Sequence, residues 1–258
     1  MVFSKSEEEH VTHVSTVLSI LGANTLFSKA SKCPFNVSSV EYLGYMVFSE
    51  GLKMDQEKFQ KILNWPPPRN LKGMQSFLGF ANFYHLFIKN YSKKISPLTK
   101  FLNKDSFFPL NEEALRQFHQ LKEAFTISPI LYYFNPSLPT IVETYASDYA
   151  LCAVLSQVSD SGKQPIVFDS HKRMPSEINY EINYKELFGI ICALKCWRAL
   201  LLSLSSPFQV LTYHSSLQYF MYSNIITCCQ AHWAEFLSEF HFSITYLPGH
   251  LATLPDAR

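Results

Sequence analysis

The chain has 258 residues, of which 47% are hydrophobic and 17% are charged, and its formal net charge is +1. This composition excludes an intrinsically disordered chain, and the length allows one large domain or two ordinary ones. No apolar stretch approaches the roughly 20 residues that a membrane span needs, and the N-terminus resembles neither a signal peptide nor a transit peptide. We expect an intracellular protein, cytoplasmic or nuclear, with no membrane partner.

The near-zero net charge conceals an asymmetry between the two halves of the chain. Residues 1–138 carry 15 basic and 11 acidic side chains, whereas residues 139–258 carry 7 basic and 10 acidic ones. No Lys or Arg occurs between Ala199 and Ala257. Because a nucleic-acid surface normally needs clustered cations to neutralise phosphates, composition predicts a poor nucleic-acid binder in the C-terminal half.

In chain order, the first predicted elements are a helix and a hairpin. Glu7–Leu21 has acidic residues in its first turn and apolar residues near helical spacing, which indicates a helix. The alternating, β-branched and aromatic residues within Asn36–Ser49 indicate a β-hairpin. Three consecutive prolines in Asn64–Asn70 exclude a helix or a central strand there, and we interpret this segment as a hinge.

Helical segments are predicted next. Leu71–Ile88 is predicted to be helical. A further helix is predicted to start at Ser96-Pro97, with proline at its first position, and Asn111–Ile127 is predicted to be an amphipathic helix capped by Asn111. Five aromatic residues lie at helical spacing here, and we interpret them as core and not as a base-stacking platform: Phe77, Phe80, Phe83, Tyr84 and Phe87.

The pattern changes after a second proline-punctuated linker, Pro129–Pro139. Strands and helices are then predicted in the order βββ-α-β-α-β, at Thr140–Ser147, Ala150–Val158, Gln164–Ser170, Ile178–Leu202, Phe208–Tyr213, Gln230–Phe240 and Phe242–Leu247. This order implies a mixed five-stranded sheet with flanking helices. The predicted fold class is therefore α/β and α+β, a mainly helical module followed by a mixed-sheet domain.

Short strings along the whole chain carry a family resemblance, and the first are Lys32-Cys-Pro-Phe35, Val40-Glu-Tyr-Leu-Gly44 and Gly51-Leu-Lys-Met-Asp55. These strings resemble the end of the reverse transcriptase palm in Ty3/gypsy-type retrotransposon Pol polyproteins, and the strings that follow resemble later parts of the same polyproteins in the same order. The thumb and connection are similar to Trp65-Pro-Pro-Pro68, Gln75-Ser-Phe-Leu-Gly-Phe-Ala-Asn-Phe-Tyr84 and Ser96-Pro-Leu-Thr99. A ribonuclease H domain is similar to Glu143-Thr-Tyr-Ala-Ser147, Tyr184-Lys-Glu-Leu187, Val210-Leu-Thr-Tyr-His214 and Tyr246-Leu-Pro-Gly249.

The resemblance implies three regions: the end of the palm at residues 1–53, the thumb and connection at 54–128, and a ribonuclease H-like domain at 129–258. It also implies that the polymerase Tyr-x-Asp-Asp motif lies upstream of Met1, in a missing N-terminal half. On that basis we expect a polyprotein fragment that cannot polymerise. The family's activities are RNA-directed DNA synthesis and cleavage of the RNA strand of RNA–DNA hybrids.

The resemblance also assigns four metal-binding carboxylate positions, which hold two Mg²⁺ ions in the family. Glu186 and Asp256 match two of them, whereas the other two positions hold Tyr145 and Tyr213. A phenol is neutral at pH 7 and larger than a carboxylate, and Mg²⁺ requires compact anionic oxygens. We therefore expect the Mg²⁺ to be lost or weakly held and the domain to be catalytically inactive.

Nearby residues offer little compensation. We interpret Asp148 as a turn residue and Asp169 as an exposed, solvated acid. His214 is a further candidate for contact with a scissile phosphate, although general acid–base help has little use without metals. The six cysteines do not have the spacing of a structural zinc site.

Cations are scarce where the family usually carries arginine, at His85-Leu86 and at Cys228-Cys229. A modest basic cluster remains in the thumb region: Lys89, Lys93, Lys94 and Lys100. These lysines are either a solvated face or residual contacts to a template–primer backbone.

Three functional interpretations follow. The first is an inactive fragment of a retrotransposon reverse transcriptase/ribonuclease H, whose family partners are a template–primer and an RNA–DNA hybrid. The alternative is a non-enzymatic, host-adopted interaction module on a ribonuclease H-like scaffold. An active hydrolase with an unusual site is a third interpretation, which a cleavage assay would test.

Overall fold

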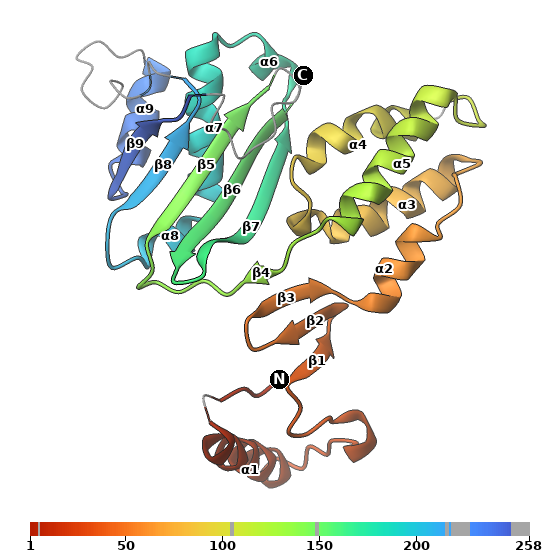
Figure 1. Ribbon diagram of the computed structural model, residues 1–258, viewed down its shortest axis with the longest axis vertical. Coiled ribbons are helices and arrows are strands. Elements are labelled where there is room, and N and C mark those ends of the chain that lie inside the picture. Colours follow the sequence, from red (N-terminus) through yellow and green to blue (C-terminus); the bar gives the residue numbers. More distant parts are fainter. Residues whose placement is uncertain (5, 104–105, 148–149, 215–216, 218–227, 249–258) are drawn as a thin grey trace.

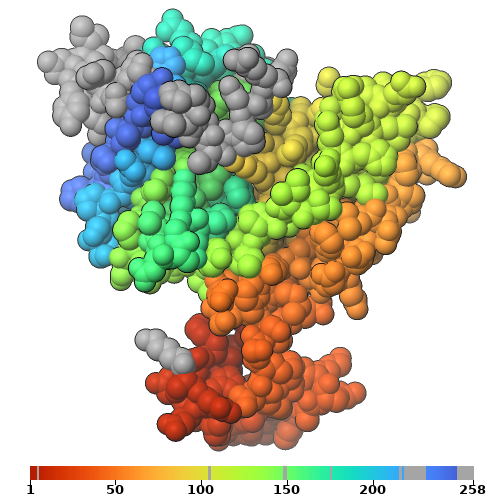
Figure 2. Space-filling view, in the orientation of Figure 1, coloured from red at the N-terminus to blue at the C-terminus, as the bar shows by residue number. Residues whose placement is uncertain are grey.

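The computed structural model describes residues 1–4, 6–103, 106–147, 150–214, 217 and 228–248. A mixed β-sheet and a group of helices lie side by side, and a small N-terminal part lies below them in the view of Figure 1. The N-terminal part forms the narrow end of the molecule, as the space-filling view shows (Figure 2). Within the described residues, no helix combines the length and the apolarity that crossing a membrane needs.

Helix α1 (Glu7–Ala23) confirms the first predicted helix. It begins after Ser6, whose hydroxyl accepts a hydrogen bond from the backbone N–H of Glu9, and three glutamates in its first turn suit the positive end of the helix dipole. None of its residues is buried, so its apolar side chains contribute to neither of the cores described below.

The predicted hairpin is confirmed as β1 (Ser39–Tyr42) and β2 (Tyr45–Phe48). Both turn residues between them have positive φ, 51° and 82°, as a two-residue hairpin turn requires. The sheet has two further strands, β3 (Gly51–Met54) and β4 (Leu131–Tyr132). A Cβ on Gly51 would lie 2.1 Å from the carbonyl oxygen of Leu131, so the pairing of β3 with β4 requires glycine there.

Residues 56–126 form what we call the helical module. Its main helices are α2 (Gln56–Leu63), α3 (Leu71–Phe83), α4 (Tyr91–Thr99) and α5 (Glu112–Thr126), with the short turns η2 (His85–Phe87) and η3 (Lys100–Leu102). The side chain of Asn111 caps α5, as predicted. The prediction that a helix starts at Ser96-Pro97 is wrong. Helix α4 starts at Tyr91, after Asn90 in the left-handed conformation, and Pro97 lies in its last turn, so its missing N–H removes only one late intrahelical bond.

Most of the aromatic strip in α3 and η2 is core, as predicted. Phe77, Tyr84 and Phe87 are almost completely buried, and Phe80 is half-buried. Phe83 differs, since it is 49% exposed and stacks on Tyr45 of β2 with 5.3 Å between ring centroids. The strip therefore joins the helical module to the N-terminal sheet.

The predicted mixed five-stranded sheet is confirmed. Its strand order is β7-β6-β5-β8-β9, in which β5 pairs antiparallel with β6 and parallel with β8, and β8 pairs parallel with β9. The strands are β5 (Thr140–Ala146), β6 (Ala150–Ser159), β7 (Gly162–Lys172), β8 (Phe208–Thr212) and β9 (Phe242–Tyr246).

The prediction of one helix over Ile178–Leu202 is wrong, because the segment is interrupted twice. The helices are α6 (Pro175–Ile178), α7 (Ile182–Cys196) and α8 (Arg198–Leu202), and α9 (Cys228–Leu237) follows β8. Glu181 is extended and precedes α7, and Trp197 has φ −106° and ψ 21°. Trp197 is 5% exposed, so the packing of this large ring overrides the local helical preference.

Two hydrophobic cores lie on opposite faces of the mixed sheet. The second core contains Val142, Leu155 and Val210 of the sheet together with the buried face of α7. The first core contains the buried residues of the helical module together with Val154 and Phe168 of the sheet. Figure 1 shows α4 beside β7. The sheet is therefore covered by α7 on one face and contacted by the helical module on the other.

Candidate functional site

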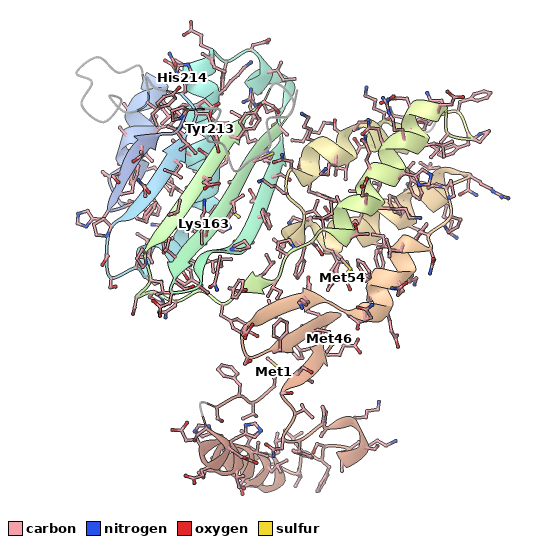
Figure 3. The ribbon with its side chains drawn as sticks, in the orientation of Figure 1. Met1, Met46, Met54, Lys163, Tyr213 and His214 are labelled. Atoms are coloured by element: carbon pink, nitrogen blue, oxygen red, sulfur yellow. The ribbon has the colours of Figure 1, made fainter. Side chains whose placement is uncertain are left out.

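Two of the predicted site positions meet at the ends of parallel strands. Tyr145 lies near the end of β5, and Tyr213 directly follows β8. The register of β5 and β8, in which Glu143 lies opposite Leu211, places Tyr145 and Tyr213 side by side on one face of the sheet. Their ring centroids are 6.1 Å apart with an interplanar angle of 71°, an edge-to-face contact. Both tyrosines are half-buried, and Figure 3 shows Tyr213 next to His214.

Tyr145 belongs to a cross-strand row. It lies opposite Cys152 of β6, which in turn lies opposite Ser170 of β7. Cross-strand partners point to the same face of a sheet, so these three side chains share the face opposite α7. Cys152 is 5% exposed, and burial together with the nearby charge of Asp169 raises the pKa of its thiol to about 12.

Glu186 approaches the same region from α7. Its carboxylate accepts a hydrogen bond from the backbone N–H of Ala146, one residue after Tyr145. Burial raises the pKa of Glu186 to about 7, an effect that this hydrogen bond and the charge of Arg173 partly oppose. Glu186 and Arg173 are each 4% exposed. Among the described residues, Glu186 Oε2 has no hydrogen-bond partner.

An ion pair between a buried acid and a more exposed lysine near the site was not predicted from the sequence. Glu143 of β5 is 3% exposed and pairs with Lys163 of β7, which Figure 3 labels. Burial lowers the pKa of Lys163, and the charge of Lys89 lowers it further. Glu143 precedes Tyr145 by two residues and so shares its face of β5, a strand periodicity that could have revealed it. An acid on this face is thus already neutralised by a lysine.

The remaining sequence candidates are placed as follows. Asp256 and Asp148 lie outside the described residues. The prediction that Asp169 is an exposed acid is wrong: it is half-buried on β7, opposite Ala153, and its charge helps to raise the pKa values of Cys192 and Cys196 to about 11, behind burial as the main cause.

His214 is half-buried directly after Tyr213. Its backbone N–H donates to the hydroxyl of Thr212 over 3.4 Å. Its backbone carbonyl accepts from the N–H of Leu217. These bonds hold the main chain in a turn just beyond β8.

The described residues do not fit two divalent ions. Mg²⁺ is bound through compact anionic oxygens, whereas Tyr145 and Tyr213 are neutral phenols that contact each other. Of the four expected positions, Glu186 is the one among the described residues that holds a carboxylate, and its raised pKa favours the protonated form that a metal would have to displace. Across the described part of the chain, no group of three or more His, Cys, Asp or Glu side chains is placed to hold a metal ion.

The lysines of the helical module are partly embedded. Lys89, Lys93 and Lys94 are half-buried, and Lys100 is exposed. Burial lowers the pKa of Lys89, and the charge of Lys93 acts on the thiol of Cys152 across the contact between α4 and the sheet. The interpretation of these lysines as one solvated face therefore applies to Lys100 alone.

Comparison with known proteins agrees with the fold and the sequence strings. Residues 110–210 match the RNase H-like domain found in reverse transcriptase. Over its whole length the chain is 36% identical to the Transposon Tf2-3 and Tf2-4 polyproteins of Schizosaccharomyces pombe. The chain is therefore similar over its full length to Ty3/gypsy-type retrotransposon polyproteins. It spans about a fifth of the length of these relatives, since it covers 20% of each.

Solved structures show the same fold. The structure of the foamy viral protease-reverse transcriptase dRH in complex with double-stranded DNA has a TM-score of 0.81 and 23% identity, covering 98% of this chain and 45% of that one. The foamy viral protease-reverse transcriptase in complex with RNA/DNA hybrid has a TM-score of 0.79 and 23% identity, covering 99% of this chain and 36% of that one. The helical module and the mixed sheet together therefore share the fold of the corresponding part of these structures.

Proposed function

We propose that this chain is part of a retrotransposon reverse transcriptase: the end of the palm at residues 1–53, the thumb and connection at 54–128, and the ribonuclease H-like domain at 129–258. We propose, as the second part, that its ribonuclease H-like site does not cleave RNA. The observation that carries the second part is the contact between Tyr145 and Tyr213. Two phenol rings fill the space where the family's chemistry needs two carboxylates.

The electrostatics of the site support the same conclusion. Hydrolysis of a phosphodiester by two metal ions depends on anionic ligands that fix both ions beside the scissile bond. Glu186 is the one described carboxylate of the four expected positions, and burial raises its pKa to about 7. Glu143 is engaged with Lys163 and lies on the tyrosine face, so it supplies no compensating free carboxylate.

The test is cleavage of an end-labelled RNA–DNA hybrid by the full chain in Mg²⁺ and, separately, in Mn²⁺. We expect no cleavage above the level of a Glu186→Gln variant, which serves as the control for contaminating nuclease. Cleavage that disappears in Glu186→Gln would overturn the proposal. The variant Tyr145→Asp/Tyr213→Asp then tests whether the two tyrosines alone prevent cleavage of the RNA strand. A gain of cleavage in this variant would show that they do.

Residual binding of a nucleic-acid duplex through the helical module is the third part of the proposed function. Lys89 and Lys94 are half-buried and Lys100 is exposed. Because only exposed cations displace phosphate counterions freely, we expect weak, salt-dependent affinity for an RNA–DNA hybrid. Lys100→Gln should reduce this affinity and the steepness of its salt dependence, whereas Lys195→Gln, an exposed lysine on α7, should leave both unchanged.

A second candidate function is a non-enzymatic interaction module. The observation that favours it is a set of exposed apolar side chains around α6 and the start of α7: Met174, Ile178 and Ile182, which are 58%, 43% and 51% exposed. Cross-linking of the chain in cells, followed by mass spectrometry, tests this candidate. It requires specific cross-links close to Ile182 that are lost in an Ile178→Ser/Ile182→Ser variant.

A further inference from the structure

We propose that Tyr145 and Tyr213 form a docking platform for the helical module, so that the sheet face which carries the substituted positions serves as an internal interface. In this view the two tyrosines do more than replace the carboxylates, because their rings also hold the helical module against the sheet. This proposal rests on the packing of the two rings and not on the absence of RNA cleavage. The cleavage assay and the experiment below can therefore refute one proposal without refuting the other.

The first support is that one hydrophobic core spans the helical module and the sheet. Its buried members in the segment that faces the sheet are Tyr84, Phe87, Ile88, Tyr91 and Leu98. Val154 of β6 and Phe168 of β7 belong to the same core, and Tyr145 and Tyr213 pack against it. The tyrosine rings therefore extend this core from β6 and β7 across β5 to β8.

The second support is a set of hydrogen bonds at the other end of the cross-strand row. The backbone N–H of Ser92 donates to Ser170 Oγ over 2.8 Å, and Ser92 Oγ donates to the carbonyl oxygen of Ser170 over 2.8 Å. The hydroxyls of Ser92 and Ser170 also lie within hydrogen-bonding distance of each other, at 3.0 Å. These bonds fix the first turn of α4 on β7, two strands away from Tyr145 in the same row.

Between these two ends lies Cys152, which connects Ser170 to Tyr145 across β6. It is 5% exposed, and the charge of Lys93 on α4 lies near enough to influence its thiol. The row from Ser170 through Cys152 to Tyr145 is thus continuous, and α4 lies at its Ser170 end. A tyrosine ring extends the apolar surface of this row, whereas an aspartate would place a hydrated charge there.

Hydrogen exchange measured by mass spectrometry on the full chain tests the platform. In Tyr145→Asp/Tyr213→Asp we expect the protection of amides in residues 87–98 to fall at least about tenfold relative to the native chain, because the helical module separates locally from the sheet. In Tyr145→Phe/Tyr213→Phe, which keeps the rings, protection should stay within about threefold of native. Tyr180→Asp, on the opposite side of the sheet, is the matched control and should leave residues 87–98 unchanged.

Three results would overturn the platform. Unchanged protection of residues 87–98 in the aspartate variant would show that the rings do not hold the module. An equal loss in the phenylalanine variant would assign the effect to the hydroxyls. An equal loss in α7 would show general destabilisation with no interface role. If the double aspartate variant does not fold, Tyr145→Asp is compared with Tyr145→Phe by the same criteria.

Discussion

Replacing Glu186 by glutamine is expected to stabilise the chain above pH 7 and to flatten the dependence of its stability on pH. Burial raises the pKa of Glu186 in the folded chain from 4.5 to about 7. The folded chain therefore binds this proton more tightly than the unfolded chain does. Between about pH 4.5 and 7 the unfolded state loses the proton first, so stability falls as the pH rises through this window.

The magnitude follows from the size of the pKa change. Each pKa unit corresponds to about 1.4 kcal/mol, so the rise of the Glu186 pKa from 4.5 to about 7 amounts to about 3 kcal/mol at pH 8 and to almost nothing below pH 4.5. Glutamine has nearly the same shape and carries no charge. The free energy of unfolding of Glu186→Gln should therefore exceed that of the native chain by about 3 kcal/mol at pH 8.

Urea denaturation of both proteins at half-unit steps from pH 4.5 to 8.5, followed by circular dichroism, measures this difference. Glu123→Gln is the matched control, because Glu123 is exposed on α5 and glutamine relieves no burial cost there. The two curves should converge at low pH and separate as the pH rises. A Glu186→Gln variant that is no more stable than the native chain at pH 8 would refute the reasoning, as would a difference independent of pH.

Three further predictions concern the fold. Phe118→Ala, at a fully buried ring, should lower the free energy of unfolding by about 3–5 kcal/mol in urea titrations, whereas Phe107→Ala, at a ring 88% exposed, should change it by less than about 0.5 kcal/mol. Gly51→Ala should lower it by about 1–3 kcal/mol, because the new Cβ would collide with Leu131, and amide exchange in β4 should quicken. Cys152, with a thiol pKa of about 12, should resist iodoacetamide at pH 8 in the folded chain and react only on unfolding, as peptide mapping would show.

Much of the architecture could be predicted from local sequence because the strongest patterns are local. Thr140–Ser147 and Ala150–Val158 are predicted as strands, and β5 and β6 confirm them. The helix over Asn111–Ile127 has a cap, first-turn acids and one apolar face, and α5 confirms it. Where cap, charge and periodicity agree, little remains for tertiary contacts to decide.

The errors lie where tertiary packing decides. Nothing local in Ile178–Leu202 indicates that Trp197 leaves helical geometry, because the cause is its burial in a core assembled from distant strands. In the same way the local sequence favours Pro97 as a first helical residue, whereas α4 begins at Tyr91, next to the hydrogen bonds between Ser92 and Ser170. A partner 78 residues away in the sequence leaves no local signal.

The candidate site shows the same division. Matching strings located Tyr145, Tyr213 and Glu186, and the structure brings these three to neighbouring positions. The ion pair of Glu143 with Lys163 escaped prediction because it joins two strands that are not adjacent in the sheet. The pairing of Glu143 with Lys163 depends on the three-dimensional arrangement of the strands. The identities of the two residues alone do not predict it.

The short strand β4 has a consequence for how the chain can be divided. Because β4 follows the helical module in sequence yet pairs with β3, which precedes it, the module leaves and re-enters one small sheet through neighbouring strands. In topological terms the module is an insertion whose two ends are held together. An N-terminal fragment that ends at residue 129 would lack β4, so the edge of β3 at Gly51 would have no pairing strand. A longer fragment that retains Leu131 and Tyr132 would keep the pairing of β3 with β4.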